Sequence, residues 1–218
     1  MINISETVLN SRLFSGISHD DLEKMLYCLS ARAVKYKKDD FVLLAGDTTD
    51  FVGLIIDGGI RIIRDDQEGN STILTELIKS EIFAEVFACA GISDSPVTIQ
   101  ATEATEVLWL NYRKIITVCG TNCLYHTKLV ENMIQLLAEK NLLLNDKIEI
   151  LSKRSTKDKL LCFFDKQRGT AKKFSVPYNR EEMACYLCVD RSAMSNELSK
   201  MRKAGLIKFK GNTFEILV

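Results

Sequence analysis

The fold is decided by residues 177–207, which read PYNREEMACYLCVDRSAMSNELSKMRKAGLI. Asn179 and Asp190 each precede a helical pattern, and both are residue types whose side-chain oxygens cap helix N-termini. Glu182 follows Asn179 by three residues, which is the spacing of a capping box. Gly205 is suited to end the second helix. Because only a brief turn at Cys188-Val189 separates the two segments, we predict a helix-turn-helix unit.

The neighbouring sequence extends this unit to a winged helix. One apolar face runs through both predicted helices, and its members are Met183, Ala184, Leu187, Met194, Leu198 and Met201. After the second helix, a Gly211-Asn212 turn separates Leu206–Lys210 from Thr213–Leu217, which is the pattern of a β-hairpin. We expect this hairpin to form the wing.

A helix-turn-helix unit predicts contact with DNA through its second helix. In this motif the second helix lies in the major groove, and its N-terminal residues contact base edges. We therefore expect base reading by Arg191, Ser192, Ser195 and Asn196. Arginine can bind guanine O6 and N7 together, which makes Arg191 the candidate for specificity. Phosphate contacts are expected from Asn179, Arg180, Lys200, Arg202 and Lys203, which would position the protein without reading sequence.

The charge distribution agrees with a polyanionic partner at the C-terminus. The whole chain has a formal net charge of zero, but residues 1–151 carry −8 and residues 152–218 carry +8. An acidic front and a basic back indicate two domains with different partners. The alternative is a solvated basic face that binds nothing.

Residues 122–151 predict one long helix with two apolar seams. The first seam is a heptad pattern, with Thr127, Ile134, Asn141 and Ile148 at a and Val130, Leu137, Leu144 and Leu151 at d. Mostly β-branched residues at a, leucines at d and a single asparagine at a favour a parallel two-stranded coiled coil. We expect the dimer seam to comprise Val130, Ile134, Leu137, Asn141, Leu144 and Ile148. The second seam, which we expect to pack on the N-terminal domain, comprises Leu129, Leu136, Leu143 and Ile150. The alternative is an ordinary buried helix without a partner.

Residues 31–110 have the texture of an antiparallel β-structure. Short β-rich runs alternate with turn signals, and they are 34–37, 41–44, 52–56, 60–64, 72–77, 97–101 and 107–110. Many short strands at regular spacing predict a sandwich or barrel. Residues 82–90 interrupt them as either a short helix or an irregular crossing segment. Before the strands, Ser18 and Asp21 have the spacing of a helix cap.

Bulk composition places the chain among globular proteins of a reducing compartment. It has 218 residues, of which 46% are hydrophobic and 27% charged. No apolar run reaches membrane-spanning length and no signal-peptide pattern is present, so we expect a cytoplasmic protein that does not contact membranes. Seven scattered cysteines then indicate reduced thiols. We favour core packing over metal ligation for Cys185 and Cys188 in the helix-turn-helix, and also for Cys119 and Cys123.

Several motifs together resemble the Crp/Fnr family of bacterial transcription regulators over nearly the whole chain. They are LFSGIS at 13–18, Tyr36–Gly46, IIDGG at 55–59, IFAE at 82–85, the long helix, and VDRSAMS at 189–195. The resemblance implies an α+β fold with a cyclic-nucleotide-binding-like β-roll sensor at 1–121, a dimerisation helix at 122–151 and a winged helix at 152–218. It implies a homodimer that binds palindromic double-stranded DNA, with RNA polymerase and a small-molecule effector as further partners. It implies no catalytic residues.

The sensor departs from the family pattern. Members that bind cyclic AMP have a glutamate for the ribose and, several residues later, an arginine for the phosphate. Here Glu85 is present, but the arginine position falls on Ser95, or on Asp94 if the alignment slips by one. We therefore expect no cyclic AMP, no metal and no other cofactor. The expected effector pocket comprises Phe83, Ala84, Glu85, Val86, Ser95 and Val97. Glu85 would bind another effector there or only satisfy backbone donors.

Other sensing chemistries and functions find less support in the sequence. Residues 1–27 contain no cysteine, so the N-terminal cluster of Fnr-type iron–sulfur proteins is absent. Neither histidine, His19 or His126, lies in the predicted β-roll to bind haem iron. The rival function is a cyclic-nucleotide-responsive regulatory module that acts through protein contacts. It would explain the β-roll but not the winged helix or the basic C-terminal part.

Overall fold

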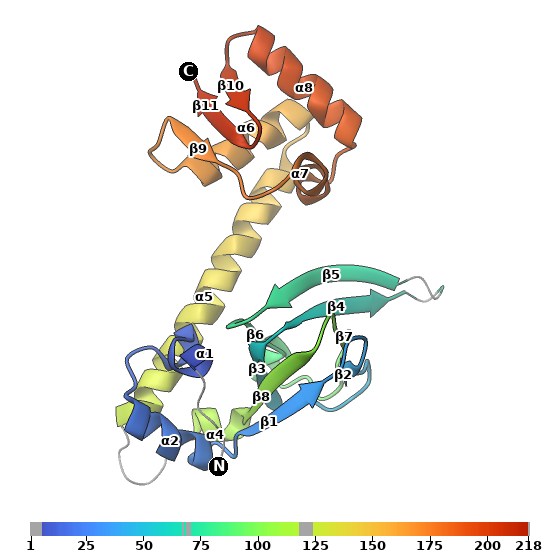
Figure 1. Cartoon of the computed structure of the whole chain (residues 1–218). Helices are drawn as coiled ribbons and strands as arrows, with labels where there is room; N and C mark the ends of the chain where they lie inside the picture. Colours follow the sequence, from blue (N-terminus) through green and yellow to red (C-terminus); the bar gives the residue numbers. More distant parts are fainter. Residues whose placement is uncertain (1–5, 67, 69–70, 118–123, 218) are drawn as a thin grey trace. The chain divides into compact units, whose positions relative to one another are not determined.

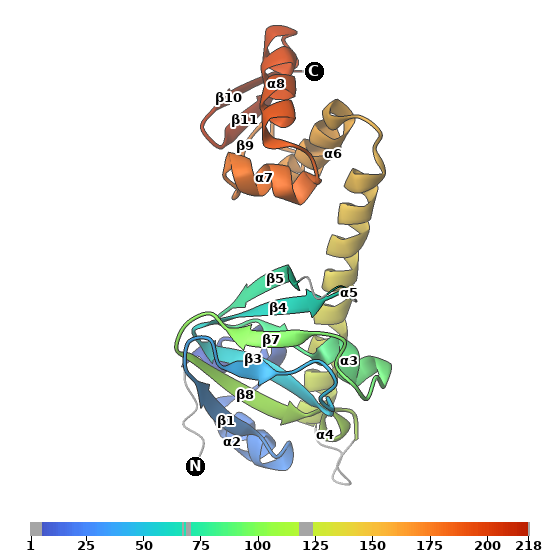
Figure 2. The same ribbon diagram turned by 90° about the vertical axis from the view of Figure 1, so that its right-hand side faces the viewer.

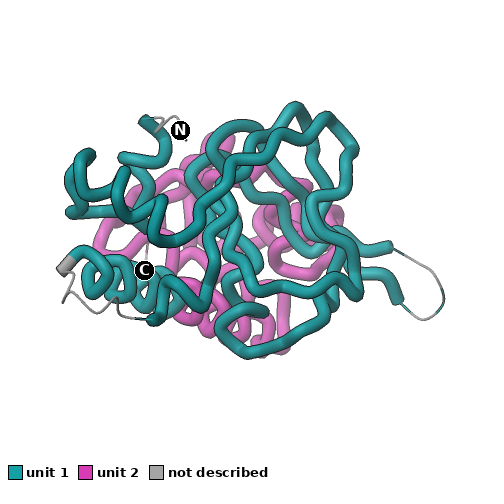
Figure 3. The backbone as a smooth tube through the Cα atoms, turned by 90° about the horizontal axis from the view of Figure 1, so that it is seen from below, with its two compact units in different colours: residues 1–138 teal, residues 139–218 magenta. Residues whose placement is uncertain are grey.

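The computed structural model describes residues 6–66, 68, 71–117 and 124–217. It divides into two compact units, residues 1–138 and 139–218 (Figure 3). The boundary falls within the long helix α5 (Leu124–Ser152), so each unit contains part of this helix. Asn122, at which the predicted long helix begins, lies outside the described residues together with Cys119 and Cys123.

Unit 1 is built around two four-stranded antiparallel sheets (Figures 1 and 2). The first has the order β1 (Arg32–Tyr36), β8 (Thr105–Asn111), β3 (Phe51–Asp57) and β6 (Ile82–Phe83). The second has the order β2 (Phe41–Leu43), β7 (Thr98–Ala101), β4 (Gly59–Asp65) and β5 (Ser71–Ile78). Each of the seven predicted β-rich runs falls on one of these strands, which confirms the β-roll. Residues 82–90 form the short strand β6 followed by helix α3 (Glu85–Ala90).

An aromatic contact fixes the inner face of the first sheet. Only glycine fits at position 53 of β3, because the Phe83 ring packs directly against the backbone there. A Cβ at this position would lie 2.2 Å from Phe83 Cζ. Phe83 in turn meets Trp109 of β8 edge to face, with ring centroids 5.2 Å apart. Both aromatic residues belong to the core cluster that also contains Ile60 and Ile99 of the second sheet. This packing joins the two sheets.

A second core in unit 1 lies under its helices. These are α1 (Glu6–Leu9), a 3-10 turn (Arg12–Phe14), α2 (His19–Cys28), α4 (Tyr112–Ile116) and the first part of α5. Ser18 caps α2 as predicted and accepts a hydrogen bond from the Asp21 backbone amide at 3.3 Å. Leu129 and Met133 of α5 are buried in this core together with Phe14 and Leu22.

Unit 2 contains the predicted winged helix. Helix α6 (Thr156–Arg168) and the strand β9 (Lys173–Ser175) precede the paired helices α7 (Arg180–Leu187) and α8 (Arg191–Lys203). The strands β10 (Ile207–Lys210) and β11 (Thr213–Ile216) form the wing, and β9 completes an antiparallel sheet in the order β10-β11-β9 (Figure 1). Phe163, Phe164 and Phe214 are fully buried at its centre.

The two seams of α5 behave differently from the simplest expectation. We expected the second seam to pack on the N-terminal domain, but only Leu129 and part of Leu136 do so. Leu143 is 67% exposed, and Ile150 is buried in the core of unit 2. That prediction is wrong for Ile150, because the end of α5 packs in the core of unit 2, and for Leu143, which lies between the two cores and belongs to neither. A regular seven-residue repeat does not show where along a helix one core ends and the next begins.

The first seam is largely uncovered in the single chain. Val130 and Leu137 pack at the edge of the unit 1 core. Ile134, Leu144 and Ile148 are 60%, 63% and 64% exposed. Asn141 is also exposed and accepts a hydrogen bond from Asn145 Nδ2 at 2.9 Å. No helix among the described residues is long and apolar enough to cross a membrane.

Asn132 is a polar clamp between α5 and the N-terminal segment, and we predict that its loss destabilises unit 1. The buried side-chain amide donates hydrogen bonds to the carbonyl oxygens of Leu13 and Ser15 at 3.0 and 2.9 Å. Asn132→Ala leaves two carbonyls without these donors. We expect the free energy of unfolding to fall by about 1–3 kcal/mol, measured by urea denaturation.

The exposed Asn145 on the same helix supplies the matched control for this prediction. Asn145→Ala should change the free energy of unfolding by less than about 0.5 kcal/mol. Equal effects of the two substitutions would contradict the role assigned to Asn132.

Candidate nucleic-acid interface

Both helices of the helix-turn-helix begin with the predicted caps. Asn179 Oδ1 accepts from the Glu182 backbone amide at 2.9 Å, and Glu182 Oε2 accepts from the Asn179 amide at 2.7 Å. At the start of α8, Asp190 Oδ1 accepts from the Ala193 amide at 2.8 Å. These bonds satisfy amides that helix geometry leaves unpaired, so the sequence itself sets where α7 and α8 begin.

The Asp190 cap also engages one candidate base-reading residue. The Ser192 hydroxyl donates a hydrogen bond to the Asp190 carboxylate. This bond, followed by the one from the Ala193 amide, lowers the pKa of Asp190 below its usual value. In the free protein, Ser192 is therefore part of the cap as well as part of the exposed helix start.

Helix α8 has a buried face and an exposed polar face. Met194, Leu198 and Met201 are buried in the unit 2 core, as predicted. The four candidate base-reading residues are all exposed, and they are Arg191, Ser192, Ser195 and Asn196. The structure thus brings them together on the first two turns of α8.

Arg191 is engaged by the preceding helix. Its Nε lies 3.1 Å from Oε2 of Glu181, and both side chains remain mostly exposed to solvent. An exposed ion pair of this kind contributes little to stability because both charges stay hydrated. The pair holds the guanidinium beside α7, and breaking it costs little free energy.

Two of the candidate phosphate contacts lie against the wing. The half-buried Arg180 guanidinium is 5.0 Å from the Phe209 ring centroid and 4.9 Å from that of Phe214. Its Nη2 donates to the Gly211 carbonyl oxygen at 3.1 Å, and burial lowers the pKa of Arg180. The Arg202 guanidinium also lies over Phe209, 5.0 Å from the ring centroid. Arg180 thus has a structural task that its sequence position did not reveal.

The remaining phosphate candidates are accessible. Lys200 and Lys203 are exposed on α8, and Lys200 forms an i,i+3 ion pair with Glu197 at 3.7 Å. Asn179 is exposed at the start of α7, where its oxygen is used by the capping box. The sequence interpretation missed Lys208 and Lys210 on β10, which are exposed on either side of Phe209. Their alternation with Phe209 was a visible signal of one basic strand face.

Two lysines distant in sequence hold the end of α7. Lys147 of α5 donates to the Tyr186 carbonyl oxygen, and its ammonium lies 3.4 Å from the Tyr186 ring centroid. Lys159 of α6 donates to the Leu187 carbonyl oxygen at 3.2 Å. Positive charge at a helix C-terminus is favourable because unpaired carbonyls gather there. No sequence pattern announces these contacts, since 28 to 39 residues separate the partners.

The prediction that Cys185 and Cys188 pack in the core is wrong. Both are exposed. The buried residues of α7 are Met183, Ala184 and Leu187, and at about 100° per residue Cys185 lies on the opposite side of the helix. Cys188 also has a φ of 49°, so it forms the left-handed turn between the helices. Among the described residues, no group of three or more His, Cys, Asp or Glu is arranged to hold a metal ion.

The expected effector residues lie around one edge of the β-roll core. Phe83, Ala84 and Val97 are buried in one cluster, and Glu85 at the start of α3 is 2% exposed. Ala84 has a φ of 62°, which turns the chain between β6 and α3. Val86 is 53% exposed and does not share this interior.

Ser95 is one of the two residues, with Asp94, that we expected at the arginine position of the resembled family, and its hydroxyl bonds to the backbone. It donates to the Val97 carbonyl oxygen at 2.7 Å and accepts from the Val97 amide at 3.3 Å. Ser95 is buried, and its own backbone pairs with Gly46 and Asp47. A serine hydroxyl has no positive charge, so Ser95 cannot make the charged contact with a phosphate that an arginine makes.

Two segments of the chain match models of known domain families. Residues 33–122 match the family of the cyclic nucleotide-binding domain, and residues 159–218 match the Crp-like helix-turn-helix domain. No curated protein matches the sequence significantly.

Solved structures resemble the chain over most of its length. CprK complexed with OCPA is 12% identical, with 89% of this chain and 88% of that chain covered and a TM-score of 0.66. The c-di-GMP-responsive global regulator CLP of Xanthomonas campestris is 15% identical, with coverage of 89% and 98% and a TM-score of 0.56. DNR of Pseudomonas aeruginosa is 17% identical, with coverage of 97% and 92% and a TM-score of 0.51. At these identities the likeness is one of fold.

The Asp190 cap predicts a pH-dependent contribution to stability. Because the hydrogen bonds lower the folded-state pKa, the ionised carboxylate stabilises the fold above the unfolded-state pKa of about 3.9. This contribution is lost as the pH falls through the lower folded-state pKa. Asp190→Asn keeps a capping side chain without the charge. We expect wild type to be more stable than Asp190→Asn at neutral pH and the gap to close under acid, as measured by urea denaturation.

Ser192→Ala tests the cause of this dependence. The hydrogen bond from the Ser192 hydroxyl is the largest cause of the lowered Asp190 pKa. In the Ser192→Ala variant, Asp190→Asn should therefore lower the free energy of unfolding at neutral pH by less than it does in the wild type. A gap that stays constant between neutral pH and about pH 3 would exclude the charged cap as its origin.

Proposed function

The chain belongs to the Crp/Fnr family of transcription regulators, and from this premise we propose that it acts as a homodimer that binds a palindromic DNA site. The observation that carries the proposal is the exposed N-terminal face of α8. Arg191, Ser195 and Asn196 project from a helix whose opposite face is buried through Met194 and Leu198. A helix presented in this way can enter the major groove with its first turns against the base edges.

We assign base reading to Arg191, with Ser192, Ser195 and Asn196 beside it. The guanidinium can bind guanine O6 and N7 together, and the hydroxyl and amide groups can serve several bases. Before it reads a base, Arg191 has to leave Glu181, which lies 3.1 Å away. The exchange is from a solvated carboxylate to a base edge, so the ion pair restrains the side chain without blocking it.

We assign phosphate contacts to Asn179, Lys200, Arg202 and Lys203, together with the wing lysines Lys208 and Lys210. These side chains are exposed around α8 and β10. Arg180 supports this surface from beneath, because its guanidinium stacks on Phe209 and Phe214 and bonds the wing turn. Its proposed contribution to DNA binding is therefore to hold the wing, in addition to any phosphate contact.

The proposed dimer uses the first seam of α5. Ile134, Leu144 and Ile148 recur at heptad positions and are each at least 60% exposed in the single chain. Apolar side chains at that spacing are stabilised by burial against a second helix. A two-fold dimer would place two α8 helices in successive major grooves, about 34 Å apart.

The proposed effector is not cyclic AMP. Glu85 is present, but the expected position of the phosphate-binding arginine falls on Ser95 or Asp94, neither of which is a cation, and Ser95 is hydrogen bonded to Val97. We propose that an effector held in the β-roll shifts the dimer seam and re-aims the recognition helices. Such a mechanism is a population shift between two arrangements of the dimer.

Base reading by Arg191 predicts a loss of specificity when the side chain is removed. Arg191→Ala should weaken binding to the preferred palindrome by about 1–3 kcal/mol per half-site and leave binding to random DNA nearly unchanged. Lys200→Ala should weaken all DNA alike and flatten the dependence on salt. Fluorescence anisotropy on a palindromic promoter fragment and on random DNA measures both.

Glu181→Gln is the matched control, since it removes the ion pair and leaves Arg191 in place. It should retain the preference for the palindrome. No preference of the wild-type chain over random DNA at moderate salt would refute the proposed function. A loss of specificity in Glu181→Gln would show that Arg191 needs the ion pair with Glu181 in order to read a base.

Asn141 provides a test of the seam. A polar pair at an a position fixes register at a cost in stability, so Asn141→Leu should lower the dimer dissociation constant by about tenfold or more. Analytical ultracentrifugation measures this dissociation constant. If dimerisation and DNA affinity both stay unchanged in Asn141→Leu, Asn141 lies outside the interface.

A further inference from the structure

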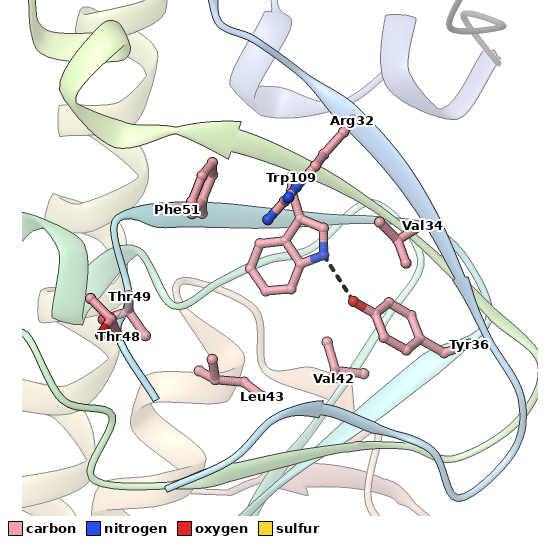
Figure 4. A pocket seen from close by; sticks show the side chains of 9 residues that line it. All are labelled: Arg32, Val34, Tyr36, Val42, Leu43, Thr48, Thr49, Phe51 and Trp109. Carbon is pink, nitrogen blue, oxygen red and sulfur yellow. Dashed lines mark hydrogen bonds between the residues drawn. The ribbon is translucent and has the colours of Figure 1, made fainter. Parts of the chain in front are cut away.

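The β-roll contains a cavity on the side formed by β1, β2, β3 and β8. Its volume is about 320 Å³, and it is lined by Arg32, Val34, Tyr36, Val42, Leu43, Thr48, Thr49, Phe51 and Trp109 (Figure 4). None of the residues expected to hold an effector, from Phe83 to Val97, lines it. The volume lies at the lower end of the range for small-molecule sites, which suits a small ring compound.

Arg32 brings an uncompensated positive charge to this cavity. Its guanidinium lies 4.7 Å from the centroid of the Phe51 ring, where the cation–π attraction holds it. Within the described part of the chain, Arg32 forms no ion pair with a carboxylate. Among the described residues that line the pocket, no other is charged, so they present one cation and no anion.

Aromatic walls and a hydroxyl complete the recognition chemistry. The indole Nε1 of Trp109 donates to the Tyr36 hydroxyl oxygen at 3.1 Å, drawn as the dashed line in Figure 4. Because that oxygen already accepts from Trp109, the Tyr36 hydroxyl proton is available to a ligand. In Figure 4, Phe51 and Arg32 lie across the space from Leu43 and Val42, with Thr48 and Thr49 at one end. Flat rings and aliphatic groups therefore line an open pocket that has the exposed guanidinium of Arg32 at one side.

We propose that this cavity binds a small aromatic carboxylate. A planar ring would pack between the Trp109 and Phe51 side and the aliphatic side chains of Val42 and Leu43. The carboxylate would accept hydrogen bonds from the Arg32 guanidinium, whose fork matches it in geometry. Because Arg32 gives the pocket one positive charge, we expect the ligand to carry one negative charge. This site goes beyond the proposed DNA-binding function and is separate from the segment around Glu85.

The position of the cavity gives such a ligand a route to the rest of the sensor. Thr49 is buried, and its hydroxyl donates to the Ile92 carbonyl oxygen at 3.2 Å while its amide donates to that of Ser93 at 3.1 Å. Thr48 pairs with Asp94 in an isolated bridge. One wall of the cavity is thus hydrogen bonded to the 92–95 segment, which ends at Ser95. A ligand that moves Thr48 and Thr49 moves this segment with them.

Trp109 makes the proposal directly measurable, because it is the single tryptophan of the chain. Benzoate titrated into the full-length protein should change the Trp109 fluorescence saturably, and calorimetry should give the same affinity. Benzamide, which keeps the ring without the charge, and acetate, which keeps the charge without the ring, should each bind at least about tenfold more weakly. No saturable change up to about 10 mM benzoate would overturn the proposal, since a site with a Kd of about 1 mM would then be filled.

Substitutions assign the binding to this cavity. Arg32→Gln should weaken benzoate binding about tenfold or more and leave benzamide binding unchanged. Lys35→Gln on the same strand is the matched control, because Lys35 is exposed, pairs with Glu106 and does not line the cavity. Thermal melting of each variant checks that the fold is retained, and Phe51→Leu supplies a second variant that should weaken both ring compounds. Equal benzoate affinities of wild type and Arg32→Gln, or equal losses in Arg32→Gln and Lys35→Gln, would overturn the proposal.

Discussion

The constraint on which the rest of the structure depends is that α5 supplies buried side chains to two separate hydrophobic cores. Leu129 and Met133 belong to the core of unit 1, and Ile150 belongs to the core of unit 2. Burying each such side chain contributes about 1.5–3 kcal/mol, so both units depend on the same helix for part of their stability. The apolar arc of the helix is wider than these cores use, which leaves Leu144 and Ile148 exposed. The proposed dimer gives this unused apolar surface a partner.

In unit 2, polar contacts at helix ends decide how the recognition helix is presented. Asn179 and Asp190 cap the starts of α7 and α8, and Lys147 and Lys159 bind the carbonyl oxygens at the end of α7. Cys188 turns the chain between the helices with a positive φ, although it has a side chain. Both helix starts and the end of α7 are thus bound by a named group, which satisfies polar groups that helix geometry leaves unpaired. The exposed face of α8 is free to vary in chemistry because none of these contacts uses it, apart from Ser192.

The β-roll combines an expected segment and an unexpected cavity. In the segment expected to hold an effector, Glu85 is buried and the Ser95 hydroxyl is hydrogen bonded to the backbone of Val97. On the β1 side, the guanidinium of Arg32 lies over the Phe51 ring in a pocket that Tyr36 and Trp109 also line. Hydrogen bonds from Thr49 to Ile92 and Ser93 join the two regions. Charge for ligand recognition is therefore present in this roll, but at another position.

The sequence by itself determined the strands of the roll, the two capped helices and the wing, because each is written in local signals. A period of two, a period of 3.6 and a capping residue act within a few positions of one another, so Asn179, Asp190 and the buried face of α8 were all predictable. Only the tertiary structure decided which core Ile150 reaches, that Arg180 stacks on the wing and that Arg191 pairs with Glu181. It alone placed Arg32 over Phe51 beside Trp109. These contacts join residues 10 to 77 positions apart, and no local pattern specifies where such side chains meet once the elements pack.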